Sequence, residues 1–263
     1  QVHDARIRDG RRFACKLQYP DMSSAVESDV GQLKAMLGLF NRMDGSIDLT
    51  EMVGEVTDRL REELDYGREA KHMALYAGML ADKDFVQVPE PVPELSTDRL
   101  LTMTWLDGER LDAFEGAAQD TRNHIAEMLF WTWWGPFNGH AVIHGDPHLG
   151  NYQVTGGGTG INLLDFGCIR VFPPTFVEGV VDLYRATLAE DFDAAYAAYE
   201  KWGFQNLSRE LVEVLNIWAR FIYGPLLDDR LRSVADGVSA GEYGRKEAFQ
   251  VRRLLKEKGP VKI

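Results

Sequence analysis

Two short polar motifs, each placed directly after an apolar stretch, constrain the fold of this chain more than any other feature. The first is His144-Gly-Asp-Pro-His-Leu-Gly-Asn151, and the second is Asp165-Phe-Gly167. Their aspartates, Asp146 and Asp165, lie only nineteen positions apart. The chain between them must therefore turn back within a short hairpin, so that the two motifs meet at one end of a small sheet.

The residues between the motifs predict that hairpin. Tyr152–Thr155 and 161–164 have the character of short strands, and the run Gly156-Gly-Gly-Thr-Gly160 joins them. The glycine run lacks the Gly-Lys-Ser/Thr ending of a phosphate-binding loop and opens no helix, so we interpret it as a turn. Asn151 before the first strand and Asp165 after the second then lie at the same end of the hairpin.

Asp146, Asn151 and Asp165 together suit phosphoryl transfer. Asn151 and Asp165 can supply oxygen ligands for a shared divalent cation, while Asp146 can orient the attacking group and accept its proton. The alternative is that both motifs are ordinary turns, since Gly and Asp are common in turns. Their joint occurrence at this spacing, each after an apolar strand, favours the chemical interpretation.

A nucleotide site of this kind also needs a cation for the phosphates. Lys16 ends the run Phe13-Ala-Cys-Lys16 in a predicted strand, which fits the position of the lysine that kinases use. That lysine needs a carboxylate to hold it, and the helical segment 62–69 offers several. Taken alone, a single lysine in an alternating strand is more often part of a solvated strand face, and a charge run of this kind is more often a solvated helix face.

The rest of the chain predicts an α+β protein in which strands and long helices come first and helices dominate after the second motif. Asp9-Gly10 marks a hairpin, and three prolines between Val86 and Pro93 mark an extended connector. The predicted strands cover 2–7, 12–18, 99–105 and 141–143, and the predicted helices cover 23–40, 48–75, 120–138, 176–190 and 192–202, with more helix beyond 208.

The composition limits the functions that are open to the chain. Its net charge of −12, without basic blocks, argues against nucleic-acid binding. Two cysteines, Cys15 and Cys168, exclude a disulfide framework and an all-cysteine zinc site. No run of about 18 apolar residues occurs, so we expect no membrane span in this chain. We expect a cytoplasmic location, with peripheral membrane contact or an organelle as alternatives.

Two further motifs accompany the polar pair, namely Lys16-Leu-Gln-Tyr-Pro20 and Glu63-Leu-Asp-Tyr-Gly-Arg-Glu-Ala70. As a set, the four motifs resemble the UbiB/AarF/ADCK family of atypical, protein-kinase-like proteins, over nearly the whole chain. The resemblance implies a two-lobed protein-kinase-like fold. Residues 1–106 would form an N-lobe with a short antiparallel sheet and long helices, and 107–263 a mainly α-helical C-lobe with the catalytic loop.

The resemblance implies a role for each matching residue. Lys16 would contact the ATP phosphates and pair with Glu69, and both would belong to the catalytic set with Asp146. Asn151 and Asp165 would bind the nucleotide through Mg²⁺ as its ligands. The implied cofactors are therefore ATP and Mg²⁺.

The resemblance also implies residues around the adenine and a family-specific regulatory pair. Met103 would border the adenine pocket, and the backbone of Thr104 and Leu106 would face the adenine edge. Glu63 and Asp65 match the E-x-D pair of the family. The K-x-G-Q extension and the alanine-rich loop of the family have no counterpart in this sequence. We therefore expect a trimmed core or a naturally reduced relative.

The short connection after the second motif bears on the substrate. Few residues separate Gly167 from the helix expected near Pro174, which leaves no room for the long segment that docks peptides in protein kinases. The resemblance agrees, since it implies MgATP binding with hydrolysis or phosphate transfer that supports ubiquinone or other isoprenoid-lipid metabolism. The implied partners are nucleotide, a lipid or isoprenoid-quinone precursor, and lipid-biosynthesis proteins. The alternatives are a nucleotide-binding pseudokinase or adaptor, and a small-molecule phosphotransferase of the aminoglycoside-kinase type.

An aromatic group on the helix expected over 120–138 has two interpretations. It comprises Phe130, Trp131, Trp133, Trp134 and Phe137. We expect most of these side chains to pack in the core. The alternative is an amphiphilic surface for a lipid or a membrane-bound partner.

Three side chains near the polar motifs receive structural interpretations. We expect His144 to brace its loop through hydrogen bonds and His148 to lie partly exposed, because two histidines on a loop lack the helical geometry of a zinc site. Cys168 is expected to be a small buried residue, with a place in the nucleotide site as the alternative.

Overall fold

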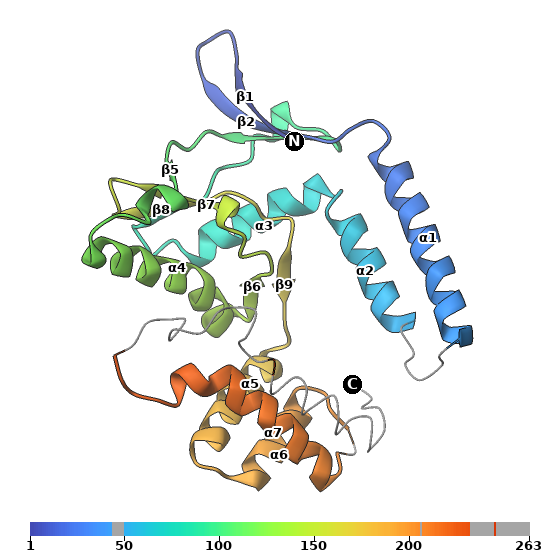
Figure 1. Ribbon diagram of the computed structural model, residues 1–263. Coiled ribbons are helices and arrows are strands. Elements are labelled where there is room, and N and C mark those ends of the chain that lie inside the picture. The colour runs from blue at the N-terminus through green and yellow to red at the C-terminus, as the bar shows by residue number, and fades with distance from the viewer. Residues whose placement is uncertain (44–49, 206, 232–244, 246–263) are drawn as a thin grey trace. The chain divides into compact units, whose positions relative to one another are not determined.

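The chain is α+β, as the sequence predicts (Figure 1). The computed structural model describes residues 1–43, 50–205, 207–231 and 245. Contacts divide the chain into two compact units, 1–171 and 172–263, each with a hydrophobic core of its own. Every predicted site residue lies in the first unit. The predicted lobe boundary at residues 106 and 107 falls inside this unit and remains a prediction.

The first unit begins with a three-stranded antiparallel sheet in the order β1-β2-β4. The strands are β1 (Val2–Arg6), β2 (Arg12–Leu17) and β4 (Leu100–Thr104). Gly10 adopts φ of 90° in the turn between β1 and β2, a conformation that glycine reaches without strain. The hairpin expected at Asp9-Gly10 is confirmed.

Lys16 lies on the face of β2 that packs into the core. Partners across antiparallel strands share a face, and Lys16 pairs with Leu101 while Ala14 pairs with Met103. Leu101 and Met103 belong to the core, and Ala14 packs against it. The Lys16 side chain is only 18% exposed, which does not fit a solvated strand face.

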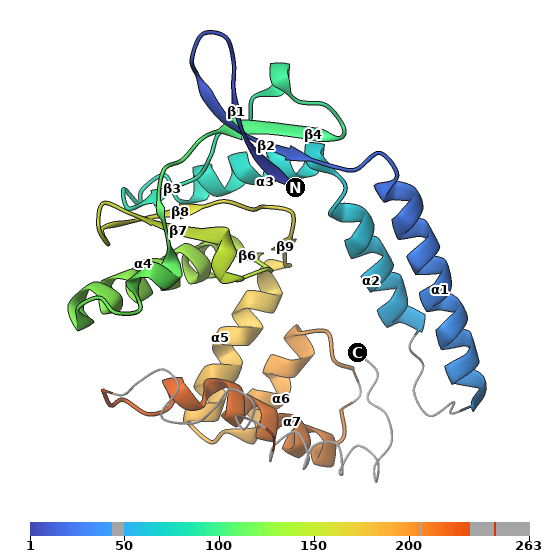
Figure 2. The same ribbon diagram turned by 45° about the horizontal axis from the view of Figure 1, so that its top comes forward.

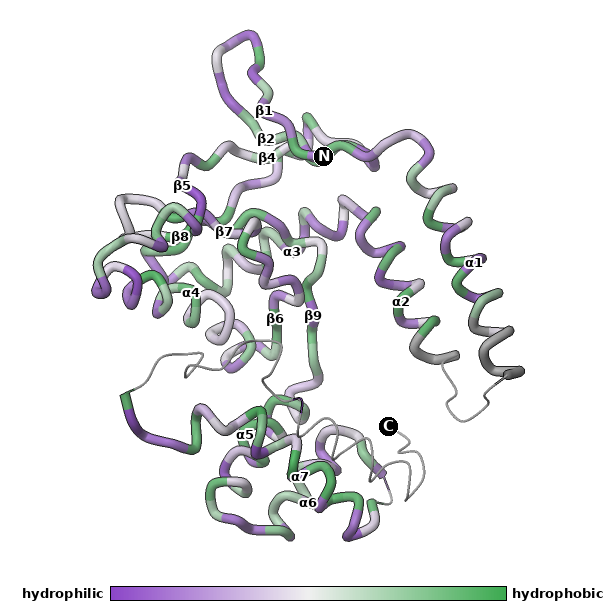
Figure 3. Tube along the Cα trace, viewed as in Figure 1, coloured by the Kyte–Doolittle hydropathy of each residue, from purple (hydrophilic) through white to green (hydrophobic). Residues whose placement is uncertain are grey.

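Three helices follow β2. They are α1 (Met22–Met43), α2 (Thr50–Glu62) and α3 (Tyr66–Met79). In both views α1 and α2 run side by side, and α3 passes beneath the three-stranded sheet (Figures 1 and 2). Hydrophobic and hydrophilic residues are interspersed along α1 and α2 (Figure 3). Across the described part of the chain, no helix combines the length and the apolar character needed to cross a bilayer.

The prediction of one continuous helix over 48–75 is wrong in its middle, because the chain breaks between α2 and α3. Part of that range, 48–49, lies outside the described residues. At the break, the side chain of Asp65 accepts a hydrogen bond of 2.8 Å from the backbone N–H of Arg68. Asp65 is therefore the N-cap of a new helix, and a side chain that satisfies an otherwise unpaired N–H favours a helix start over a helix interior.

The two polar motifs lie at the ends of short strands. A four-stranded sheet has the order β3-β8-β7-β5, and a separate two-stranded sheet pairs β6 with β9. The strands are β3 (Val86–Gln87), β5 (Glu109–Arg110), β6 (Val142–His144), β7 (Tyr152–Thr155), β8 (Gly160–Leu163) and β9 (Ile169–Val171). The predicted hairpin between the motifs is confirmed as β7 and β8.

One long helix, α4 (Gln119–His140), packs against β6 and β8. It carries the aromatic group, whose predicted packing in the core is confirmed for Phe137 but not for Phe130 and Trp131, which are 50% and 44% exposed. Short 3₁₀ turns cover η1 (Pro93–Leu95), η2 (Leu111–Phe114), η3 (Leu149–Asn151) and, in the second unit, η4 (Gly224–Leu226).

The core of the first unit joins α3, α4 and the strands β4, β6, β7, β8 and β9. Its most buried members are Met73 and Tyr76 from α3, Leu101 from β4, Met128 from α4, Val154 from β7, Ile161 and Leu163 from β8, Ile169 from β9, and Phe166. Burying apolar side chains of this size contributes about 1.5–3 kcal/mol each. This core therefore fixes the strand ends that carry the polar motifs.

The second unit is helical, as expected after the second motif. It contains α5 (Pro174–Leu188), α6 (Phe192–Lys201) and α7 (Arg209–Tyr223). Asp191 caps α6 by accepting the N–H of Ala194 at 3.0 Å. The three helices enclose their own apolar cluster.

The N-cap at Asp65 gives a test of the break between α2 and α3. We expect Asp65→Ala to lower the free energy of unfolding by about 1 kcal/mol, because the Arg68 N–H loses its partner. Asp65→Asn keeps a side-chain acceptor and should stay much closer to the parent. Urea denaturation of the three proteins measures both effects. Equal losses in the two variants would show that the cap does not set the helix start.

Candidate active site

Lys16 lies between two carboxylates that come from distant parts of the sequence. Its Nζ is 2.8 and 3.0 Å from the two oxygens of Glu69 on α3, and 2.9 Å from Oδ2 of Asp165, after β8. The three side chains differ in exposure: 2% for Glu69, 18% for Lys16 and 38% for Asp165. The structure therefore brings together Lys16, Glu69 and Asp165 at the edge of the core.

Burial and the charges within this triad shift the pKa values of its three members. Burial alone would lower the pKa of Lys16, but the carboxylates, first Glu69 and then Asp165, keep that pKa above its usual value. Burial also raises the pKa of Glu69, and Lys16 offsets only part of that effect. For Asp165, Lys16 and the Gly167 N–H outweigh burial and hold the pKa below its usual range. The Lys16 ammonium and the Asp165 carboxylate thus stabilise each other in their charged forms.

Asp146 and Asn151 contact each other within the first motif. The amide nitrogen of Asn151 donates to Oδ2 of Asp146 at 2.9 Å and to the Asp146 backbone oxygen at 3.0 Å. The backbone oxygen of Asn151 accepts the N–H of Leu164 at 3.0 Å, next to Asp165. The first motif is thereby tied to the strand end that carries Asp165, and Asp146 is exposed.

Two histidines hold the backbone of the Asp-Phe-Gly motif. Nε2 of His144 lies 2.6 Å from the carbonyl oxygen of Asp165, and Nδ1 of His72 lies 3.1 Å from the carbonyl oxygen of Phe166. The predicted bracing role of His144 is confirmed. His72 is not predicted from the sequence, although its position on α3, three residues after Glu69, is a signal for it.

His144 is fixed in one neutral form by its contacts. The Nε2 atom faces a carbonyl acceptor, while Nδ1 accepts the backbone N–H of Asp146 at 3.3 Å. This network assigns the proton to Nε2. Burial lowers the pKa of His144, with the Asp165 carbonyl and carboxylate offsetting part of the effect. His148, by contrast, is exposed, as expected, and accepts the N–H of Gly150.

Phe166, between Asp165 and Gly167, anchors the second motif in the core. It is fully buried and makes edge contacts with the rings of Tyr76 and His144 at centroid distances of 5.5 and 6.1 Å. The Gly167 N–H donates to Oδ1 of Asp165 at 2.9 Å, and this hydrogen bond restricts the orientation of that carboxylate. The apolar ring and the backbone turn together determine where the carboxylate of Asp165 lies.

The three residues predicted around the adenine occupy one strand end. Met103 is buried in β4, Thr104 is the last residue of that strand, and Leu106 lies half-buried in the irregular segment after it. The backbone N–H of Thr104 donates to the carbonyl oxygen of Glu90 at 2.9 Å. The Thr104 N–H is therefore already paired with another backbone group, while the assignment of the segment to adenine binding remains a prediction.

Glu63 and Asp65 do not join the triad. Asp65 caps α3, as described above, and Glu63 is an exposed residue in the same break. The intervening Leu64 accepts a hydrogen bond of 2.7 Å from the side chain of Gln18, just beyond β2. The break between α2 and α3 is thereby tied to the strand that carries Lys16.

The oxygen ligands at this site suit Mg²⁺. Within the described residues, no three His, Cys, Asp or Glu side chains converge on one point as a metal cage. Mg²⁺ usually binds through one or two carboxylates together with substrate phosphates. Asp165 and the side-chain oxygen of Asn151 are hard donors of that type, so these residues fit a magnesium–nucleotide site.

The neutral form of His144 predicts a pH effect. An unfolded imidazole titrates near 6.5, and the folded pKa is lower, so the unfolded chain binds the proton first as the pH falls. The stability gained from neutral His144 is complete above about pH 6.5 and is lost as the pH falls through the folded pKa. We expect His144→Gln to be less stable at pH 7.5 but to lose less stability between pH 7.5 and 5. Urea denaturation across this range checks this, and identical pH profiles for variant and parent would contradict it.

Comparisons with known proteins place this geometry in a family. Residues 1–199 match the family model described as the ABC1 atypical kinase-like domain. The chain is 28% identical over 204 residues to the atypical kinase COQ8, mitochondrial, of Saccharomyces cerevisiae, covering 78% of this chain and 41% of that protein. It is 31% identical over 193 residues to COQ8B, mitochondrial, of Rattus norvegicus, covering 73% of this chain and 37% of that protein. The chain thus spans less than half the length of these two relatives.

A solved structure supports the fold. The Mycobacterium tuberculosis protein Rv3197, determined in complex with erythromycin, matches with a TM-score of 0.64 at 22% identity, covering 97% of this chain and 70% of that one. At this level of identity the likeness shows a shared fold. Together with the family match over residues 1–199, it confirms the predicted protein-kinase-like class. The chain belongs to the ABC1 atypical kinase-like domain family, which is the UbiB/AarF/ADCK family that its motifs resemble.

Proposed function

We propose that this chain binds MgATP beside Lys16, Asn151 and Asp165, and hydrolyses ATP or transfers its terminal phosphate. The observation that carries the proposal is the contact of Lys16 with both Glu69 and Asp165. A charged lysine that is paired with a helix glutamate and lies next to the Asp of an Asp-Phe-Gly motif is the arrangement that protein kinases use for phosphoryl transfer. The family match supports the same reaction class.

Each side chain has a distinct task in this proposal. Glu69 holds the Lys16 ammonium in place, and phosphate oxygens would replace the Asp165 carboxylate as a partner of Lys16. Asp165 and Asn151 would hold Mg²⁺, which neutralises charge on the phosphates when it is bound. Asp146 would orient the attacking oxygen and accept its proton, and its own carboxylate is positioned by the side-chain amide of Asn151.

The short segment after Gly167 supports a substrate other than a peptide. Strand β9 begins at Ile169 and pairs with β6, and α5 already begins at Pro174. This leaves only two residues between β9 and α5, so a peptide-docking segment has no place there. We propose that the reaction supports ubiquinone or related isoprenoid-lipid metabolism, with a lipid or isoprenoid-quinone precursor and lipid-biosynthesis proteins as partners. The two relatives described above are named as mitochondrial proteins, which supports a site of action in an organelle.

Two variants should separate nucleotide binding from chemistry. In the parent, we expect MgATP to raise the melting temperature more than ATP with a chelator does. Asp165→Asn should abolish this Mg²⁺-dependent difference, because the metal loses its charged ligand. Asp146→Asn should keep the difference but lower ATP turnover by about 10²-fold or more, because it removes only the proton acceptor. Thermal shift and phosphate release measure the two effects.

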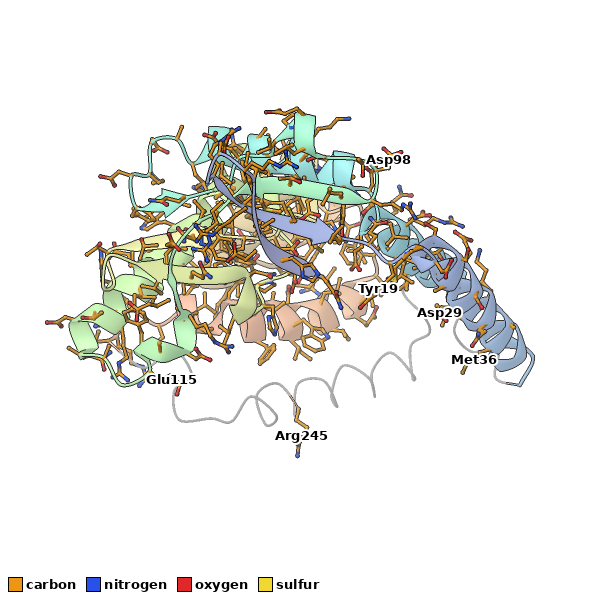
Figure 4. The ribbon with its side chains drawn as sticks, turned by 90° about the horizontal axis from the view of Figure 1, so that it is seen from above. Tyr19, Asp29, Met36, Asp98, Glu115 and Arg245 are labelled. Atoms are coloured by element: carbon orange, nitrogen blue, oxygen red, sulfur yellow. The ribbon has the colours of Figure 1, made fainter. Side chains whose placement is uncertain are left out.

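The matched control is Asp98→Asn, which makes the same chemical change in an exposed turn before β4 (Figure 4). This variant should behave like the parent in both assays. Circular dichroism establishes whether each variant is folded. An equal MgATP shift in Asp165→Asn and the parent would contradict the metal assignment, and undiminished turnover in Asp146→Asn would contradict the role of Asp146.

A further inference from the structure

Glu62, at the end of α2, is surrounded by arginines from three different elements. Its Oε2 lies 2.5 Å from Arg59 on α2, 2.6 Å from Arg68 on α3 and 3.4 Å from Arg170 on β9. The four side chains are all between 24% and 31% exposed. One carboxylate therefore joins two helices to the strand that follows the Asp-Phe-Gly motif.

The charges make Glu62 the member on which this cluster depends. With Glu62 ionised, three guanidinium groups share one anion. Burial raises the pKa of Glu62, but Arg68 and Arg59 outweigh burial and hold that pKa below its usual value. Without the carboxylate, partly buried like charges would face one another, which is unfavourable. Arg59 depends less on Glu62 than the other two arginines do, because Arg59 also pairs with the exposed Glu55.

Two of these arginines, Arg68 and Arg170, lie next to parts of the candidate active site. Arg68 immediately precedes Glu69, the partner of Lys16. Arg170 lies close to the first polar motif, since a Cβ built on Gly145 would be 3.6 Å from Cγ of Arg170 and 2.9 Å from the carbonyl oxygen of Cys168. The Gly145 N–H donates to that same carbonyl at 2.6 Å. Glu62 is thus connected to α3 on one side and to the loop of Asp146 on the other.

We infer that Glu62 is a positioning residue. It holds α3, which carries Glu69, in a fixed position relative to β9 and to the loop that carries Asp146. Glu62 touches neither Lys16 nor the predicted metal ligands, and it acts through Arg68 and Arg170. The inference rests on the proposed function in one respect: that catalysis takes place at the site whose geometry Glu62 maintains. The connection between the two helices and β9 can be measured without nucleotide.

The first test is hydrogen–deuterium exchange of Glu62→Gln, with Glu55→Gln as the matched control. Both variants remove one carboxylate that contacts Arg59, but only Glu62 reaches Arg68 and Arg170. We expect Glu62→Gln to speed amide exchange by about threefold or more in β6, Gly145 and β9, since these segments lose their link to the helices. Glu55→Gln should leave these segments unchanged. Faster exchange confined to α2 and the start of α3 would overturn the inference.

The second test is steady-state ATP turnover in the same variants. Glu62→Gln should lower kcat by about fivefold or more and change KM for ATP less than twofold, because the site is misaligned and no contact to the nucleotide is removed. Glu62→Asp, which keeps the charge, should recover part of the loss. An unchanged kcat in Glu62→Gln would overturn the inference. If the parent itself turned over no ATP, the proposed function would fail, and the exchange experiment would still decide whether Glu62 connects the helices to β9.

Discussion

The Lys16 ammonium lies between two carboxylates that follow it by 53 and 149 residues in the sequence. A strand, a helix and the end of another strand must all be correctly placed for this contact to form. Glu69 is almost fully buried, so losing its ammonium partner would cost about 3–5 kcal/mol. The rest of the first unit can therefore be understood as the framework that brings these three side chains together.

That framework combines an apolar anchor with polar contacts to the backbone. Phe166 is buried against Tyr76, which fixes the turn on which Asp165 lies. His144 contacts the carbonyl oxygen of Asp165, and His72 contacts that of Phe166. This turn is therefore held both from the first motif and from α3. The same arrangement keeps His144 neutral, and its Nδ1 accepts the N–H of Asp146. The positions of Asp146, the proposed proton acceptor, and Asp165, the proposed metal ligand, thus depend on one set of contacts.

The sequence predicts the parts of this site that depend on local spacing. Asp146, Asn151 and Asp165 lie at the ends of a short hairpin, and periodicity and turn residues suffice to predict it. The sequence does not predict the break at Asp65, because the apolar pattern of α2 and α3 is nearly continuous and one capping side chain decides the outcome. It also does not predict the contacts of Glu62 with Arg170, 108 residues away, because long-range ion pairs leave no periodic signal.

We propose that Lys16 lies where the phosphates of ATP bind. An acyl-phosphate derivative of ATP, which transfers its acyl group to lysines beside the bound phosphates, tests this directly when the modified residues are identified by mass spectrometry. We expect Lys16 to be labelled and to be protected by excess MgATP, while Lys83, a lysine outside the triad, is labelled more weakly and without protection. Labelling of Lys16 no stronger than that of Lys83, and unaffected by MgATP, would contradict the claim.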